Sequence, residues 1–133
     1  MVKAIKINHV TLLVDNKKKA EEFYTEILGF EKYEIGNSLW IKVGDGFIHL
    51  TESPEASTRN SFYHFGIEIQ NVQEYIKELI SKGLKIFDLD KKLNEVFINS
   101  ELNKPKRQFF LRDIDGNLLE FIEANSQFFN PVK

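Results

Sequence analysis

Three histidines and one glutamate are the residues of this chain best suited to catalytic chemistry. The sequence has only three histidines, His9, His49 and His64, and each falls within a segment that predicts a β-strand. Glu120 lies on one face of a predicted strand between large apolar residues, where a carboxylate is costly unless it is paired or bound to a metal. Imidazole nitrogen and carboxylate oxygen suit Zn, Fe, Mn, Ni or Co, so these four residues predict a metal site.

An internal repeat places these residues at matched positions. His9 and His64 are 55 positions apart, and so are Asn16 and Asn71, each of which stands where a helix is expected to begin. The first strand and the helix start therefore recur in register. This matching favours a metal site over the alternative for any single histidine, which is a hydrogen-bonded, half-buried side chain.

The ends of the two repeats carry His49 and Glu120, which are 71 positions apart. The 16 additional positions match a polar insertion in the second repeat, at 90–107. The repeat thus pairs His9 with His64 and His49 with Glu120.

Each repeat is expected to contain one strand, one helix and three further strands. In the first, the predicted strands are 5–14, 30–35, 39–43 and 47–52, and the helix ends at Gly29. In the second, the predicted strands are 62–69 and 84–89, the helix spans 71–83, and a hairpin at 109–123 turns at Asp115-Gly116. A second, longer hairpin is considered around Asn103.

Composition excludes several classes of protein. The 133 residues suffice for one well-buried core, and a net charge of −2 without a dense basic run gives no case for nucleic-acid binding. The absence of cysteine excludes disulfides and thiolate ligands. No segment predicts a signal peptide or a membrane span, so we expect a cytoplasmic protein.

The chain resembles the vicinal oxygen chelate superfamily, which includes glyoxalase I, extradiol dioxygenases, and fosfomycin- and bleomycin-resistance proteins. The resemblance covers nearly the whole chain and is carried by the segments NHVTLLV, AEEFYTEILGF, FYHFGIEI and FFLRDIDGNLLEF. It implies an α+β fold with two βαβββ modules forming a curled mixed sheet around a central cavity. The modules would form a single domain, with module 1 at about 1–53, module 2 at about 61–124 and a C-terminal tail at 125–133.

The resemblance also implies a ligand set for one divalent ion. The family's usual ligands fall on His9, His64 and Glu120 in this sequence. The glyoxalase branch adds a fourth ligand, normally Glu, at the position of His49. Whether His49 binds the ion or only points into the cavity stays open, as does the identity of the ion among Zn, Ni, Mn, Co and Fe.

A substrate that binds the ion through neighbouring oxygens follows from the same resemblance. Glu120 is a candidate proton acceptor, and Thr11, on the face of His9, is a candidate hydrogen-bond donor to the substrate. The residues expected to line the substrate pocket are Trp40, Phe47, Phe62, Phe110 and Arg112.

Three functions are compatible with this pattern. The favoured one is a metal-dependent lyase, isomerase or thiol-transfer enzyme of the glyoxalase type. The others are an extradiol-type dioxygenase and a non-catalytic protein that binds a small molecule such as an antibiotic. Family members usually form homodimers, and the tail with Phe128 and Phe129 is compatible with one.

Overall fold

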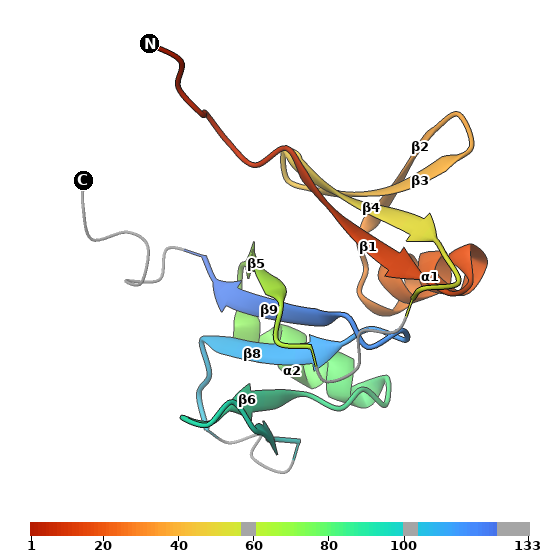
Figure 1. Ribbon diagram of the computed structural model, residues 1–133. Coiled ribbons are helices and arrows are strands. Elements are labelled where there is room, and N and C mark those ends of the chain that lie inside the picture. Colours follow the sequence, from red (N-terminus) through yellow and green to blue (C-terminus); the bar gives the residue numbers. More distant parts are fainter. Residues whose placement is uncertain (57–60, 100–103, 125–133) are drawn as a thin grey trace. The chain divides into compact units, whose positions relative to one another are not determined.

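The computed structural model describes residues 1–56, 61–99 and 104–124, and it divides the chain into two compact units, Met1–Arg59 and Asn60–Lys133. Each unit is a mixed sheet accompanied by helix (Figure 1). The predicted tail with Phe128 and Phe129 lies outside the described residues. The two sheets confirm the α+β fold of two related modules.

Unit 1 is a four-stranded sheet with its helical segment inserted after the first strand. Its elements are β1 (His9–Val14), α1 (Lys17–Glu22), a π-helical turn (Phe23–Ile27), β2 (Glu31–Ile35), β3 (Ser38–Val43) and β4 (Gly46–Glu52). The strand order is β1-β4-β3-β2, with β1 parallel to β4 and the other pairs antiparallel.

Alternation along the strands of unit 1 separates an apolar face from a face that carries polar and aromatic groups. Leu39 and Ile41 of β3 and Ile48 and Leu50 of β4 are buried, as are four residues of the helical segment, Ala20, Phe23, Tyr24 and Leu28. Because neighbouring residues of a strand point to opposite faces, Trp40 and His49 lie on the other face of the sheet.

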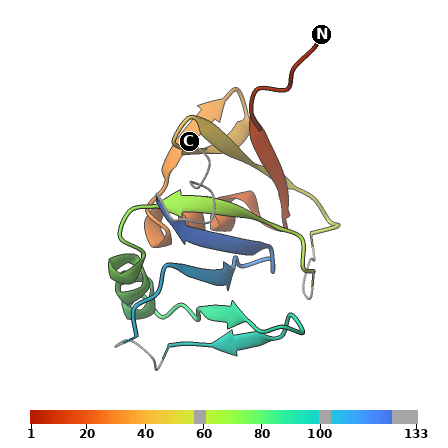
Figure 2. The ribbon, with the colours of Figure 1, turned by 90° about the vertical axis from the view of Figure 1, so that its left-hand side faces the viewer.

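Unit 2 repeats this arrangement and adds one edge strand. Its elements are β5 (His64–Ile69), α2 (Val72–Ser81), β6 (Phe87–Leu89), β7 (Glu95–Phe97), β8 (Gln108–Arg112) and β9 (Leu118–Glu123). Figure 2 shows its five strands in the order β5-β9-β8-β6-β7, with β5 parallel to β9. Without β7, this order matches that of unit 1.

The two units also share the contacts that join the last strand to the helix. In unit 1, the carboxylate of Glu52 accepts a hydrogen bond from the backbone N–H of Lys17. In unit 2, the carboxylate of Glu123 accepts from the N–H groups of Asn71 and Val72. Glu52 and Glu123 are 71 positions apart, the same spacing as His49 and Glu120. The internal repeat predicted from the sequence is thereby confirmed.

The side-chain caps of the helices follow the repeat as well. Asn16 accepts a hydrogen bond from the N–H of Lys19, and Asn71 accepts one from the N–H of Glu74. Both asparagines are the helix caps that the spacing predicts, although Asn71 takes a left-handed conformation with a φ of 60°. Gly29, with a φ of 82°, ends the first helical segment as expected.

The first strand is shorter than predicted for reasons of pairing. It begins at His9 rather than at residue 5, because His9 pairs with Phe47 near the start of β4. Among the described residues, the segment before Asn8 has no ladder partner, and Ile5 and Ile7 are exposed. The longer hairpin considered around Asn103 turns outside the described residues. Within the described part, β7 pairs with β6 through the segment 90–94.

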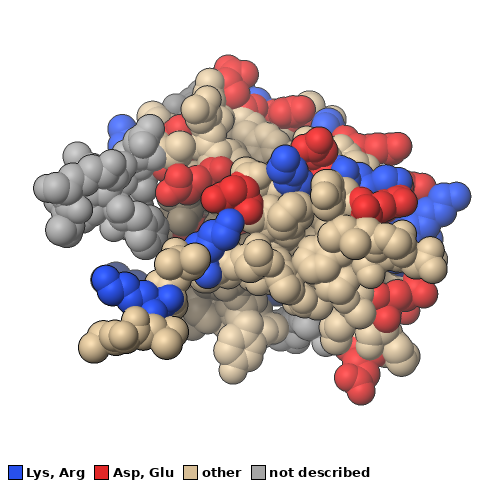
Figure 3. Space-filling view, turned by 90° about the horizontal axis from the view of Figure 1, so that it is seen from above, with Lys and Arg blue, Asp and Glu red and all other residues tan. Residues whose placement is uncertain are grey.

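Charged side chains of both signs are interspersed on the face seen in Figure 3, with uncharged surface between them. Among the described residues, no helix has the length and apolar character needed to cross a membrane.

Candidate functional site

His64 and Glu120 form a direct pair in unit 2. Nε2 of His64 lies 3.0 Å from Oε1 of Glu120, and the two side chains are 19% and 14% exposed. The pair joins neighbouring parallel strands, β5 and β9, in which Gly66 is the register partner of Glu120. The structure therefore brings these two side chains into contact, and their shared role as ligands stays a prediction.

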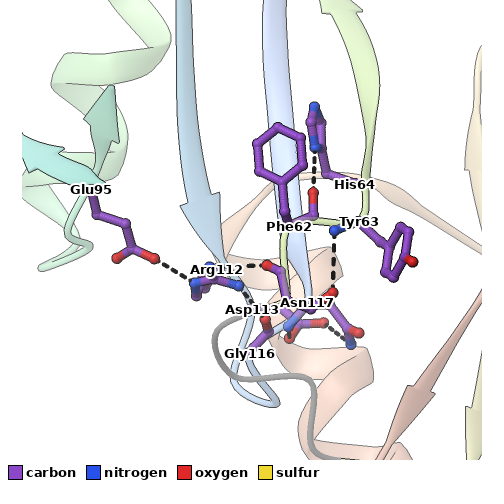
Figure 4. A network of polar contacts seen from close by, with 9 residues as sticks. Phe62, Tyr63, His64, Glu95, Arg112, Asp113, Gly116 and Asn117 are labelled. Carbon is purple, nitrogen blue, oxygen red and sulfur yellow. Dashed lines mark hydrogen bonds and ion pairs between the residues drawn. The ribbon is translucent and has the colours of Figure 1, made fainter. Parts of the chain in front are cut away.

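The other ring nitrogen of His64 fixes the orientation of the imidazole. Nδ1 lies 2.8 Å from the carbonyl oxygen of Phe62, as Figure 4 shows. A carbonyl can only accept, so Nδ1 carries the proton and Nε2 is the nitrogen left to face Glu120. A carboxylate and an unprotonated nitrogen are both acceptors, so this contact holds either a shared proton, which makes it a hydrogen bond, or a metal ion.

This donor set fits a divalent ion. Histidines that bind metals usually donate the second ring N–H to a carbonyl or carboxylate, as His64 does to Phe62. Among the described residues, no group of three or more His, Cys, Asp or Glu side chains is placed to hold a metal ion. Unit 2 contributes His64 with Glu120, and unit 1 contributes His9 with His49. The ligand set of four residues stays a prediction.

Aromatic rings surround the His64–Glu120 pair. Phe62 and Phe110 make edge-on contacts with the imidazole of His64, with ring centroids 5.0 and 5.4 Å away. Phe110 is buried together with Phe87 and Leu118 in an apolar cluster. Two of the predicted pocket residues therefore do flank a predicted ligand, and they give it an apolar surrounding.

The glycine opposite Glu120 packs closely against the neighbouring strand. A Cβ added at Gly66 would lie 3.1 Å from Cδ1 of Ile122, which is a tight contact, and 3.8 Å from Oε1 of Glu120, which is an ordinary one. A larger residue at this position would therefore have to displace the side chain of Ile122.

His9, His49 and Trp40 form a second cluster, on the open face of unit 1. The Trp40 and His49 rings are stacked, with centroids 4.0 Å apart and planes at 5°. His9 meets Trp40 edge-on at 4.9 Å and lies 6.3 Å from the His49 ring. These contacts cross three adjacent strands, β1, β4 and β3, whose register brings the side chains together.

Burial and a neighbouring imidazole both act on His49. Burial lowers the pKa of His49, and the charge of His9 lowers it further. Both effects favour the neutral imidazole, which is the form that binds metals or accepts protons. The indole Nε1 of Trp40 is buried and, among the described residues, has no hydrogen-bond partner.

Thr11 and Phe47 lie where the alternation predicts. Thr11 is the register partner of His49 and is exposed, so its hydroxyl lies on the same open face. Phe47 contacts Trp40 edge-on at 6.0 Å and also contacts Tyr33.

A hollow of about 230 Å³ lies elsewhere in unit 1, and it is lined by Lys17, Glu21, Glu34, Gly36, Asn37, Ser38 and Leu39. None of the predicted site residues contributes to it.

Arg112 is held by its own unit. Its guanidinium donates to Glu95 at 2.7 Å, to the carbonyl of Gly116 at 2.8 Å and to the carbonyl of Ser61 at 3.2 Å (Figure 4). These partners connect β7, the β8–β9 turn and the segment before β5. These contacts hold the guanidinium at the turn.

Gln108 is a site residue that the sequence analysis missed. Its side-chain amide donates a hydrogen bond to Oε2 of Glu120, the oxygen that His64 does not contact. The hairpin signal at Asp115-Gly116 could have identified it, because that turn sets Phe110 opposite Glu120 and so places Gln108 diagonally across from the carboxylate.

The chain belongs to the glyoxalase/bleomycin resistance protein/dioxygenase superfamily, whose family model matches residues 6–121. Solved structures agree with this assignment. A Bacillus anthracis protein provisionally assigned to the glyoxalase family is 25% identical, with 92% of this chain and 98% of that chain covered and a TM-score of 0.69. No curated protein matches the sequence.

Two more distant structures have the same fold. A genomically encoded fosfomycin resistance protein from Listeria monocytogenes is 18% identical, covers 96% of this chain and 95% of its own, and has a TM-score of 0.65. An antibiotic binding protein from a Streptomyces species is 20% identical, with coverage of 92% and 98% and a TM-score of 0.66. These two likenesses show the fold alone.

Proposed function

We propose that this protein is a divalent-metal-dependent enzyme of the glyoxalase type, with lyase, isomerase or thiol-transfer activity on a small substrate that binds the ion through its oxygens. The observation that carries the proposal is the His64–Glu120 pair. An imidazole nitrogen and a carboxylate oxygen lie 3.0 Å apart, and the carbonyl of Phe62 holds the ring in this orientation. The 25% identical Bacillus anthracis protein, provisionally assigned to the glyoxalase family, supports the same class of function.

The proposed ion-binding residues are His64 and Glu120 together with His9 and His49. When bound, the ion would stabilise negative charge that develops on a substrate oxygen. Glu120 is the proposed proton acceptor, because a carboxylate oxygen can take up a proton from the substrate. Thr11 is the proposed hydrogen-bond donor, because its hydroxyl is exposed on the face that carries His9 and His49.

The proposed substrate pocket consists of the aromatic residues that flank these groups, namely Trp40, Phe47, Phe62 and Phe110. Arg112 is left out because its guanidinium already has three partners. A cytoplasmic homodimer belongs to the same proposal and rests on the family resemblance alone.

The second candidate is a non-catalytic protein that binds a small molecule. The stacked pair of Trp40 and His49 favours it, because half-buried aromatic rings on an open sheet face offer a flat apolar surface to a planar ligand. A metal measurement separates this candidate from the enzyme.

The decisive experiment measures the metal content and metal-dependent melting temperature of untagged protein. We expect one divalent ion per chain and stabilisation by about 2.7 kcal/mol when the free ion is at 100 times its Kd. His64→Ala and Glu120→Ala should abolish the shift. Glu68→Ala is the matched control, because Glu68 shares the strand and face of His64 but is exposed.

If no ion binds under any condition, the enzyme proposal fails and the binding protein remains. If an ion binds, substrates to screen are adducts of dicarbonyls with thiols, catechols and fosfomycin. A substrate that the wild type converts and Glu120→Ala does not convert would then identify the reaction.

A further inference from the structure

Glu120 is held at both of its carboxylate oxygens by different strands. Oε1 faces Nε2 of His64 on β5, and Oε2 accepts a hydrogen bond from the side-chain amide of Gln108 on β8. Glu120 itself is on the strand between them, β9. The carboxylate therefore has one oxygen directed at the candidate metal ligand and one directed away from it.

The Gln108 contact is built into the sheet. Gln108 pairs with Ile122, two residues beyond Glu120, so its side chain reaches diagonally along the shared face of β8 and β9. Both residues are only partly exposed, and Phe110, the register partner of Glu120, is buried beside them. In such surroundings a hydrogen bond to a charged group is stronger than at the surface, and its loss leaves the carboxylate oxygen unpaired.

We propose that Gln108 is a positioning residue that makes Glu120 present a single oxygen, Oε1, to the cation at His64. With Oε2 occupied by the amide, Glu120 would bind an ion through one oxygen instead of two. This inference rests on the proposed metal-dependent function, but the Gln108–Glu120 hydrogen bond exists without an ion and is testable without one.

The metal-dependent test uses Gln108→Met, which has similar length but no donor. Gln70→Met is the matched control, because Gln70 is exposed just beyond the end of β5. We expect Co²⁺ affinity to fall about 10–100-fold in Gln108→Met, and the visible absorption bands of bound Co²⁺ to change as Glu120 takes up a second bond to the ion. A merely structural role for Gln108 would leave those bands unchanged. Equal affinity and identical bands in Gln108→Met and wild type would overturn the inference.

The metal-free test compares melting temperatures of the apo-protein in a double-mutant cycle. Gln108→Met should lower the melting temperature in the wild-type background but not in the Glu120→Ala background, since the partner is then already gone. Equal effects in both backgrounds would overturn the inference. If the wild type binds no ion while the cycle shows coupling, the proposed function fails but Gln108 still positions Glu120.

Discussion

At the scale of single residues, one face of the sheet in unit 2 carries polar side chains with different roles. His64 and Gln108 both contact Glu120, whereas Arg112 contacts the chain around it. Residue type alone does not distinguish these roles, since an arginine near a predicted metal site is a natural candidate for binding an anion. The partners do distinguish them, because three of the five N–H groups of the guanidinium already bind one carboxylate and two carbonyls.

Replacing Arg112 should therefore affect stability rather than substrate binding. We expect Arg112→Ala to lower the free energy of unfolding by about 1–3 kcal/mol, because Glu95 and two carbonyls lose a charged donor. Urea denaturation measures this change, and Arg107→Ala, at an exposed side chain, serves as the control. Unchanged stability together with a large loss of substrate affinity would show that Arg112 grips the substrate instead.

At the scale of elements, the same type of contact fixes a helix to its sheet in both units. A glutamate at the end of the last strand caps the backbone N–H groups at the start of the helix, Glu52 in unit 1 and Glu123 in unit 2. A carboxylate at this position also interacts favourably with the helix dipole. Since His49 and Glu120 lie three residues before these glutamates, the caps also fix the strands that carry the site.

Removing the cap of unit 2 should cost more than removing the cap of unit 1. Glu123→Ala removes two hydrogen bonds and is expected to lower the free energy of unfolding by about 1–2 kcal/mol, whereas Glu52→Ala removes one. Thermal or urea denaturation measures both, with Glu31→Ala, at an exposed position of β2, as the control. An effect of Glu123→Ala no larger than that of the control would contradict the capping role.

At the scale of the whole molecule, the four residues predicted to bind the ion are divided between the two units. Unit 1 supplies two imidazoles around Trp40, and unit 2 supplies the His64–Glu120 pair. Trp40 is the only tryptophan in the chain, so its fluorescence reports on unit 1 alone.

Binding of Co²⁺ or Ni²⁺ should therefore quench the fluorescence of Trp40. A paramagnetic ion bound by His9 or His49 would lie close to the indole, because both rings contact it. His64→Ala should weaken ion binding and quenching in parallel if all four residues form one site. Stoichiometric binding without quenching would show that the ion is held by unit 2 alone.

Much of the fold and part of the site could be predicted from the sequence. The α+β fold, the repeat, both asparagine caps and the pairing of strand faces follow from local patterns, because side-chain alternation and capping depend on neighbours in the chain. For the same reason, alternation correctly placed Thr11 on the face of His9 in the first strand.

Only the tertiary structure decided what depends on partners distant in sequence. The first strand starts at His9 because β4 begins there, and β7 joins β6 because the ladder is set by residues on other strands. The amide of Gln108 on Glu120 and the three bonds of Arg112 are decided in the same way. Composition and periodicity determined which residues share a face, whereas the register between strands determined which of them touch.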